Sequence, residues 1–83
     1  MADKTLILYG GSGCHLCDQA RALIYPLLPG EWRLREIDVR EDPGLEALYG
    51  LRIPVIAVEG GAEKGWPFSA GQVRRLMASA SGP

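Results

Sequence analysis

Two cysteines, Cys14 and Cys17, are the residues of this chain best suited to chemistry. They are its only cysteines, and they enclose its only histidine, His15, together with Leu16. Two thiols at this spacing in the first turn of a helix can form and break a disulfide without moving the fold. A redox-active dithiol is therefore the first hypothesis.

The position of each thiol along the expected helix predicts a different role. Unpaired N–H groups and the positive end of the helix dipole stabilise an anion at a helix N-terminus. Such a position lowers the pKa of a cysteine from about 8.5 to about 3.5–7.5. We expect Cys14, nearer the loop, to be exposed and to attack a substrate disulfide. Cys17 is expected to be more buried and to resolve the mixed disulfide.

Two other uses of these residues stay open. In one, the thiols are inert and the domain is a non-catalytic module that holds an extended peptide. In the other, the two thiolates carry a metal ion or an iron–sulfur cluster. A zinc site takes four ligands, whereas Cys14, Cys17 and His15 supply three, so a carrier would share its metal or cluster between two chains.

Length and composition fit one domain, residues 1–83, with 47% hydrophobic residues and a net charge of −1. This near-neutral charge gives no electrostatic case for nucleic acid or an anionic membrane as a partner. No apolar stretch approaches the roughly 18 residues that suggest a membrane span. Two cysteines are too few for the scaffold of a small secreted protein, and Met1–Lys4 has no signal-sequence pattern. We expect a cytoplasmic monomer without a tightly bound cofactor.

A strand and a helix should enclose the dithiol. The apolar run Lys4–Tyr9 predicts a strand that ends at the Gly10–Gly13 turn. The helix that follows is weakened at Pro26 and stopped at Pro29. Its predicted buried stripe comprises apolar residues at helical spacing, namely Leu16, Ala20, Leu23, Ile24 and Leu27.

The middle of the chain predicts a second strand and a second helix. In the strand Trp32–Val39, the apolar residues change face between Leu34 and Ile37, so the strand either contains a bulge or is covered on both sides. Asp42 and Pro43 are typical of a helix start. The apolar face of this helix is expected to comprise Leu45, Leu48 and Tyr49, with Gly50 as its C-terminal cap.

A hairpin and a third helix complete the chain. Ile53–Val58 and Ala62–Trp66 are predicted strands, joined by the turn residues Glu59-Gly60-Gly61. Ser69 and Gln72 form a capping box at the start of the last helix. A hydrophobic staple is expected between Phe68 and Val73, and the buried face of the helix is predicted to comprise Val73, Leu76, Met77 and Ala80.

These elements give the order βαβαββα. The first strand, helix and second strand imply a right-handed parallel unit, and the hairpin adds two antiparallel strands. We therefore predict an α/β fold, a four-stranded mixed sheet with helices on both faces. With Cys-x-x-Cys at the end of the first strand, this is the thioredoxin-like arrangement.

Three segments resemble small bacterial glutaredoxin-like proteins. The stretch Tyr9–Ala20 is similar to their active-site segment, while Ile37-Asp38-Val39, Asp42-Pro43 and Leu51–Val55 are similar to their middle region. The match in order and spacing covers about residues 4 to 80. The resemblance implies a glutaredoxin-like thiol–disulfide oxidoreductase that acts on protein disulfides or glutathione mixed disulfides, with glutathione as a reductant or co-substrate.

The resemblance also implies a substrate-facing wall. In related families the proline that matches Pro54 has a cis peptide bond and faces the dithiol. Ile53 would then offer its backbone N–H and C=O to an extended peptide or to glutathione. We expect His15 and Leu16 to contact substrate, and Arg52 to attract an anionic substrate carboxylate. Asp38 is expected to cap or to face solvent rather than to accept a proton from Cys17.

The chain departs from these families near the dithiol. Dithiol glutaredoxins have Pro-Tyr between the cysteines and a lysine three residues before the first cysteine, where this chain has His15-Leu16 and Gly11. Their glutathione-binding Gly-Gly segment corresponds to Gly65–Ser69, and the tryptophan that thioredoxins place before the first cysteine corresponds to Gly13. High-affinity glutathione binding therefore does not follow from the resemblance.

Overall fold

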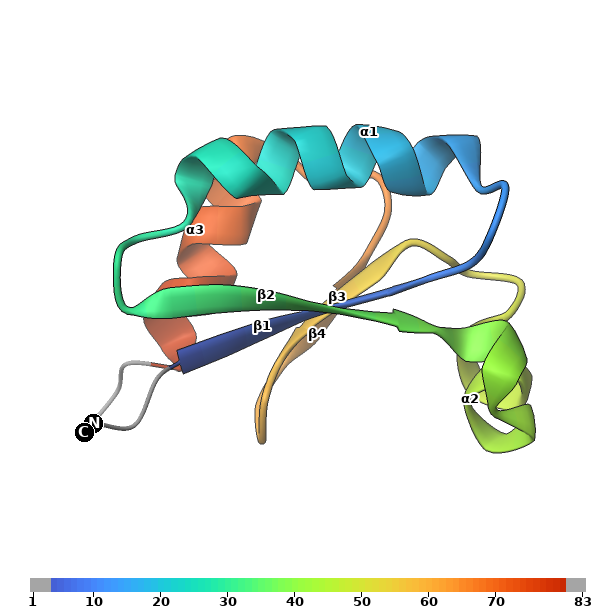
Figure 1. Cartoon of the computed structure of the whole chain (residues 1–83). Coiled ribbons are helices and arrows are strands. Elements are labelled where there is room, and N and C mark those ends of the chain that lie inside the picture. The colour runs from blue at the N-terminus through green and yellow to red at the C-terminus, as the bar shows by residue number, and fades with distance from the viewer. Residues whose placement is uncertain (1–3, 81–83) are drawn as a thin grey trace.

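The computed structural model describes residues 4–80 of the chain. Its elements follow the predicted order βαβαββα, with two short 3-10 turns, η1 and η2, inserted (Figure 1). The strands are β1 (Lys4–Gly10), β2 (Trp32–Asp38), β3 (Val55–Val58) and β4 (Glu63–Gly65). The helices and turns are α1 (His15–Ile24), η1 (Tyr25–Leu27), η2 (Val39–Glu41), α2 (Pro43–Tyr49) and α3 (Ala70–Ser79).

The four strands form one mixed sheet in the order β2-β1-β3-β4. Strands β1 and β2 are parallel and pair one residue with one residue from Lys4 opposite Trp32 to Gly10 opposite Asp38. This continuous register shows that β2 contains no bulge. Strand β3 is antiparallel to both β1 and β4. Strand β1 lies between β2 and β3. The loop that follows β1 therefore lies between the segment that follows β2 and the segment that precedes β3.

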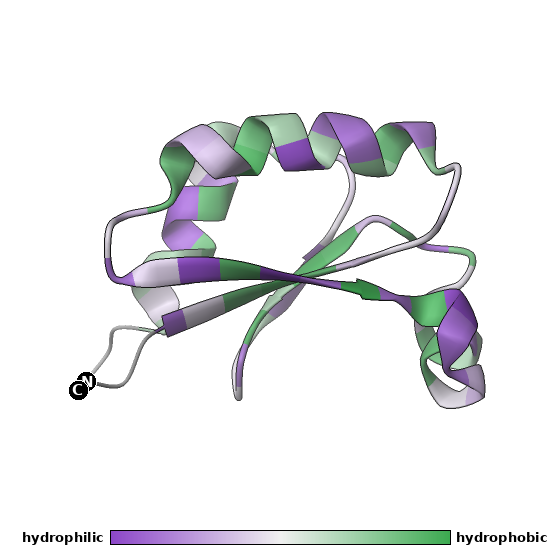
Figure 2. Cartoon of the chain, viewed as in Figure 1, coloured by the Kyte–Doolittle hydropathy of each residue, from purple (hydrophilic) through white to green (hydrophobic). Residues whose placement is uncertain are grey.

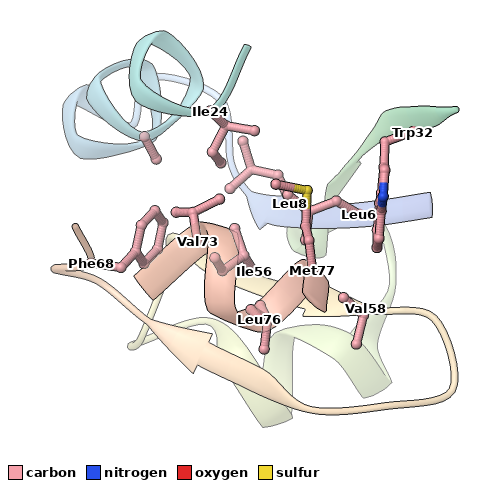
Figure 3. Packing of buried hydrophobic residues seen from close by; sticks show 11 residues of the cluster. Leu6, Leu8, Ile24, Trp32, Ile56, Val58, Phe68, Val73, Leu76 and Met77 are labelled. Atoms are coloured by element: carbon pink, nitrogen blue, oxygen red, sulfur yellow. The ribbon is translucent and has the colours of Figure 1, made fainter. Parts of the chain in front are cut away.

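Helices α1 and α3 pack on one face of the sheet and enclose the main core (Figures 1 and 3). Alternate residues of β1, Leu6 and Leu8, point into this core because side chains alternate between the two faces of a strand. Figure 2 shows the corresponding alternation of polar and apolar positions along α1. The core cluster comprises Leu6, Leu8, Ala20, Ile24, Trp32, Ile56, Val58, Phe68, Val73, Leu76 and Met77.

The opposite face of the sheet is partly covered by α2. Tyr49 of α2 stacks on Tyr9 of β1 with 4.4 Å between the ring centroids. Because Tyr9 lies on the face opposite to Leu8, this contact places α2 across the sheet from α1, near the end of the strands (Figure 1). Helices therefore lie on both faces, as predicted. Ile37 is half-buried on this face, but Arg33 and Arg35 on the same face of β2 are exposed, so β2 is covered on its second side only near its end.

Three apolar positions differ from the predicted buried faces. Leu16 is 42% exposed and Leu48 is 62% exposed, while Ala80 lies just after the last turn of α3 and is exposed. Leu16 lies about 100° around the helix from the buried Cys17, and therefore at the edge of the buried stripe. In α1 the buried line is instead Cys17, Ala20 and Ile24. Cys17 thus takes the core position that the sequence pattern assigned to Leu16.

The predicted strand bounds were too wide in the second half of the chain. Strand β3 begins at Val55 rather than Ile53, and β4 is limited to Glu63–Gly65. Pro54 has no N–H to donate to a sheet, yet its carbonyl oxygen accepts a hydrogen bond from the Trp66 N–H at 3.0 Å. Strand β2 likewise ends at Asp38, and Val39 is buried in the following turn.

The predicted caps of α2 and α3 are confirmed. The Asp42 carboxylate accepts hydrogen bonds from the N–H groups of Gly44 and Leu45 at the start of α2. Ser69 and Gln72 form the reciprocal capping box at the start of α3. In the part of the chain that the structure describes, no helix is long and apolar enough to cross a membrane.

Candidate functional site

The two cysteines lie where β1 ends and α1 begins. Cys14 is the N-cap residue of α1, and Cys17 belongs to its first turn. They are joined by a disulfide, with 5.2 Å between their Cα atoms. The structure therefore represents the oxidised form of the dithiol. The two thiols can be linked within one turn of the helix, as their spacing predicted.

Cys17 is the more buried of the two cysteines, as predicted, whereas Cys14 is less exposed than expected. Cys14 is half-buried, whereas Cys17 is 1% exposed and belongs to the core face of α1. The Cys17 N–H donates a hydrogen bond to the Cys14 Sγ at 3.1 Å. This is the N-cap contact of α1, because a side chain accepts from one of the backbone donors that the helix leaves unpaired. The reduced form would direct the same N–H at a thiolate.

The sulfur of Cys17 packs against Gly10, the last residue of β1. A Cβ atom built on Gly10 would lie 3.0 Å from the Cys17 Sγ, closer than ordinary van der Waals contact. Behind Cys17 lies a recess of about 260 Å³, which is lined in part by Ser12, Arg21, Glu36 and Asp38. Cys17 thus borders both the apolar core and a polar recess.

The Ile53–Pro54 peptide bond is cis, as expected from the resemblance. Strand β3 is antiparallel to β1 with Val55 opposite Tyr9, so Pro54 and Ile53 come next to Gly10 and the residue after it. A Cβ atom on Gly11 would lie 3.3 Å from the Cδ1 of Ile53. The segment before β3 therefore flanks the loop that leads to Cys14. The Trp66–Pro67 bond is a second cis peptide.

His15 and Leu16 are exposed on the first turn of α1, between the two cysteines. The expected contact of these two residues with substrate stays a prediction. The exposed fraction of Leu16, 42%, leaves an apolar side chain at this surface.

Arg52 is already engaged within the chain. Its Nη2 lies 3.6 Å from the Glu63 Oε2, and its guanidinium is 5.3 Å from the centre of the Tyr49 ring. Glu63 also accepts a hydrogen bond from the Tyr49 hydroxyl at 2.8 Å, which is the largest cause of the raised pKa of Tyr49. The Arg52 guanidinium therefore contacts residues of both α2 and β4.

Asp38 caps the turn after β2, as expected. Its Oδ1 accepts a hydrogen bond from the Arg40 N–H at 2.9 Å, and its Oδ2 accepts one from the Ser12 hydroxyl at 3.1 Å. The Arg40 N–H is the largest cause that lowers the pKa of this carboxyl. The hydrogen bond to Ser12 also ties the end of β2 to the loop before Cys14.

Sequence reasoning missed Arg40, which reaches the same loop. Its Nη1 donates a hydrogen bond to the carbonyl oxygen of Ser12 at 2.7 Å. The position of Arg40 in the sequence, just after a predicted strand, could have indicated it. In parallel sheets, functional groups gather beyond the carboxyl ends of neighbouring strands, and both Arg40 and the dithiol follow such ends.

No metal centre is assembled within one chain by the described residues. Across residues 4–80, no three His, Cys, Asp or Glu side chains form a group that could hold a metal ion. A metal or cluster carrier would accordingly need ligands from a second molecule.

Comparison with solved structures confirms the thioredoxin-like fold. The crystal structure of XcR50 from X. campestris superposes with a TM-score of 0.76 at 36% identity, covering 94% of this chain and 99% of that one. The solution structure of Ne2328 from Nitrosomonas europaea gives a TM-score of 0.74 at 26% identity, covering 90% and 92%. A malarial protein at 14% identity shares the fold, with a TM-score of 0.70 and coverage of 94% and 97%. No curated protein matches.

A family model for the Glutaredoxin-like domain (DUF836) matches residues 5–78. This match extends from β1 through nearly all of α3 and includes the dithiol loop, the cis proline and the capped last helix. The structural similarity to XcR50 agrees with it over nearly the whole length of both chains. Together with the dithiol at the end of β1, these findings show that the chain belongs to the glutaredoxin-like domain family.

Proposed function

We propose that this protein is a thiol–disulfide oxidoreductase whose substrates are protein disulfides or glutathione mixed disulfides. The observation that carries the proposal is the asymmetry of the dithiol. The Cys14 sulfur caps α1 and accepts a backbone N–H, whereas Cys17 is buried one turn further. Membership of the glutaredoxin-like family, together with two thiols that differ in burial and can form a disulfide, favours disulfide exchange over a purely structural role for the disulfide.

Cys14 is the proposed nucleophile because its surroundings favour an anion. The Cys17 N–H and the N-terminal end of the ten-residue helix α1 face its sulfur. Both stabilise negative charge, and such an arrangement lowers the pKa of a thiol below about 8.5. Cys14 is also the less buried of the two cysteines. A substrate disulfide can therefore reach the sulfur that is more readily ionised.

The exchange proceeds in two balanced steps. The Cys14 thiolate attacks one sulfur of the substrate disulfide, forms a mixed disulfide and releases the other sulfur as a thiolate. The Cys17 thiolate then attacks the Cys14 sulfur and releases the remaining substrate thiolate. The substrate gains two electrons, and the dithiol loses two and becomes the Cys14–Cys17 disulfide. The released thiolates take up protons from solvent according to their pKa values.

An external thiol reductant closes the cycle. It attacks the Cys14–Cys17 disulfide, and two reductant thiols become one disulfide while both protein cysteines return to the reduced form. We propose glutathione or a dithiol protein for this role. The protein would act as a monomer in the cytoplasm, where thiols are kept reduced.

The substrate would lie along the segment before Pro54. We propose that Ile53 offers its backbone N–H and C=O to an extended segment, while the exposed His15 and Leu16 contact the side nearer α1. The proximity of Ile53 to Gly11 supports this arrangement. A substrate carboxylate at Arg52 would have to compete with Glu63 for the guanidinium.

The direct experiment traps the mixed disulfide. Cys17→Ser, incubated with a peptide disulfide or a glutathione mixed disulfide, should accumulate an adduct on Cys14 that mass spectrometry identifies. Cys14→Ser is the matched control and should form little adduct, because Cys17 is buried. Equal adducts on the two variants would contradict the assigned roles. A wild-type protein that reduces neither substrate would contradict the proposed function.

A further inference from the structure

The η2 turn, which follows β2, lies directly beside the loop that carries Cys14. Because β1 and β2 are parallel with Gly10 opposite Asp38, the residues after these two positions leave the sheet side by side. Two side-chain contacts then cross between them. Arg40 donates to the Ser12 carbonyl oxygen at 2.7 Å, and the Ser12 hydroxyl donates to Asp38 at 3.1 Å.

The guanidinium of Arg40 lies close to Gly11. A Cβ atom on Gly11 would be 3.2 Å from both Cζ and Nε of Arg40 and 3.3 Å from Ile53 Cδ1. The loop therefore passes between Arg40 on the β2 side and Ile53 on the β3 side. Arg40 limits the movement of this loop from one side, as Ile53 does from the other.

The positive charge of Arg40 is less compensated than that of the other arginines near the recess and α2. Arg21 makes two ion pairs of 2.7 Å, and Arg52 makes one with Glu63. Within residues 4–80, Arg40 makes no such ion pair, and its one side-chain hydrogen bond is to a carbonyl oxygen. Acidic groups do surround it: Asp38 interacts with its charge over a longer distance, and Glu41 and Asp42 follow it in the chain.

The positive charge of Arg40 is also close enough to Cys14 to interact with it electrostatically. Ser12, the residue it contacts, precedes Cys14 by two positions, and two residues span at most about 7 Å. With the 2.7 Å hydrogen bond and the reach of the Cys14 side chain added, the guanidinium lies at most about 12 Å from the sulfur, which is comparable to the screening distance of about 10 Å at 0.1 M salt. A negative charge that develops on the Cys14 sulfur therefore lies within range of the guanidinium.

We propose that Arg40 is a positioning residue for the Cys14 nucleophile, holding the preceding loop in place and keeping a positive charge within electrostatic range of the sulfur in its anionic form. The inference rests on the proposed role of Cys14 as the nucleophile. Arg40, which belongs to the η2 turn, would then lower the Cys14 thiol pKa in addition to the N-terminal end of α1. The loop contact and the charge are separable, because a lysine retains the charge without the planar guanidinium, whereas a methionine retains neither.

The test compares Arg40→Met, Arg40→Lys and the control Arg74→Met. Arg74 is an exposed arginine of α3, so its replacement changes the net charge equally at a remote site. The readout is the Cys14 thiol pKa in the reduced protein, from the pH dependence of its alkylation rate, resolved from Cys17 by mass spectrometry. Arg40→Met should raise this pKa by about 0.5–1 unit at 0.1 M salt. Arg74→Met should leave it unchanged.

Two further arms separate the charge from a general loss of structure. The pKa difference between the wild type and Arg40→Met should shrink at 1 M salt, where the screening distance is about 3 Å. Arg40→Lys should recover most of the shift. The proposal would be overturned if the Cys14 pKa in Arg40→Met equalled that of the wild type. It would also be overturned if Arg40→Met and Arg74→Met raised the Cys14 pKa by the same amount. So would a shift that Arg40→Lys fails to reduce and salt does not affect.

The readout also keeps this inference distinct from the proposed function. Alkylation requires no substrate disulfide and no turnover. A wild type that reduces no disulfide, but whose Cys14 pKa responds to Arg40 as described, would contradict the oxidoreductase proposal and leave the role of Arg40 standing. A wild type that is active, with a Cys14 pKa insensitive to Arg40, would contradict the role of Arg40 alone.

Discussion

Replacing Gly10 with alanine tests how closely Cys17 packs behind the dithiol. The new Cβ would lie 3.0 Å from the Cys17 Sγ and 3.4 Å from its Cβ. Comfortable contacts between carbon atoms are about 3.5–4.0 Å, so one side must move by about half an ångström. Gly10 is held in the sheet by β2, and Cys17 is held in α1 at 1% exposure. Neither can swing into solvent to relieve the contact.

The magnitude follows from overpacking in a small domain. Inserting a methyl group into a well-packed site costs about 1–3 kcal/mol. The polar recess beside Cys17 can absorb part of the displacement, so we expect about 1–2 kcal/mol. Because 1 kcal/mol corresponds to about 4–8 °C in a domain of this size, the Tm of the oxidised Gly10→Ala variant should fall by about 5–15 °C.

The assay is thermal and guanidinium denaturation of the oxidised protein, with Gly30→Ala as the control. A Cβ on Gly30 would meet no atom within 4 Å, and the φ of Gly30 is not positive. The control should therefore stay within about 0.5 kcal/mol of the wild type. Equal unfolding free energies for Gly10→Ala and Gly30→Ala would refute the close packing of Cys17 against β1.

Two further substitutions test the fold and its response to acid. Ser69→Ala removes the side-chain acceptor of the capping box on α3; it should lower the free energy of unfolding by about 1 kcal/mol in denaturant titrations, and an unchanged midpoint would contradict the cap. Asp38→Asn tests the carboxyl whose folded-state pKa is lowered from 3.8, chiefly by the Arg40 N–H. A lowered folded-state pKa gives stability that is present above the ordinary pKa and lost as the pH falls through the folded value. The unfolding free energy of Asp38→Asn should therefore decline less steeply than that of the wild type below about pH 4, and parallel curves would count against this role.

Local sequence signals were sufficient for much of the fold. Asp42 before Pro43, and Ser69 three residues before Gln72, each satisfy backbone donors within their own turn of helix. Such contacts depend on neighbouring residues only, so they could be predicted without knowledge of the sheet. The greater burial of Cys17 could be predicted for the same reason, because the distance of each cysteine from the helix start was known.

Apolar periodicity failed at the edge of a helix face and on a helix that contacts the sheet only near the strand ends. Leu16 was assigned to the same helix face as Ile24, but the buried line of α1 passes through Cys17 instead and leaves Leu16 at its edge. Leu48 lies on α2, which contacts the strands through Tyr49 near their ends. A periodic pattern identifies a helix face, whereas its burial depends on how far the partner layer extends. That extent is a property of the assembled sheet.

Arg40 could not be assigned from its sequence neighbourhood. Its contact with Ser12 spans 28 positions and depends on the register that sets Gly10 opposite Asp38. A shift of one residue in that pairing would reverse the faces of β2 and carry the guanidinium away from the loop. This contact therefore arises from strand register, which the apolar residues of β1 and β2 determine together.

The most direct test of the central claim is the thiol pKa of Cys14 compared with that of Cys17. Site-resolved alkylation of the reduced protein across pH would give both values in one experiment. The proposed mechanism predicts a Cys14 pKa below about 7.5 and slow alkylation of Cys17, because only Cys14 both caps α1 and reaches solvent. A Cys14 pKa near 8.5 or higher, or a Cys17 that reacts first, would contradict it.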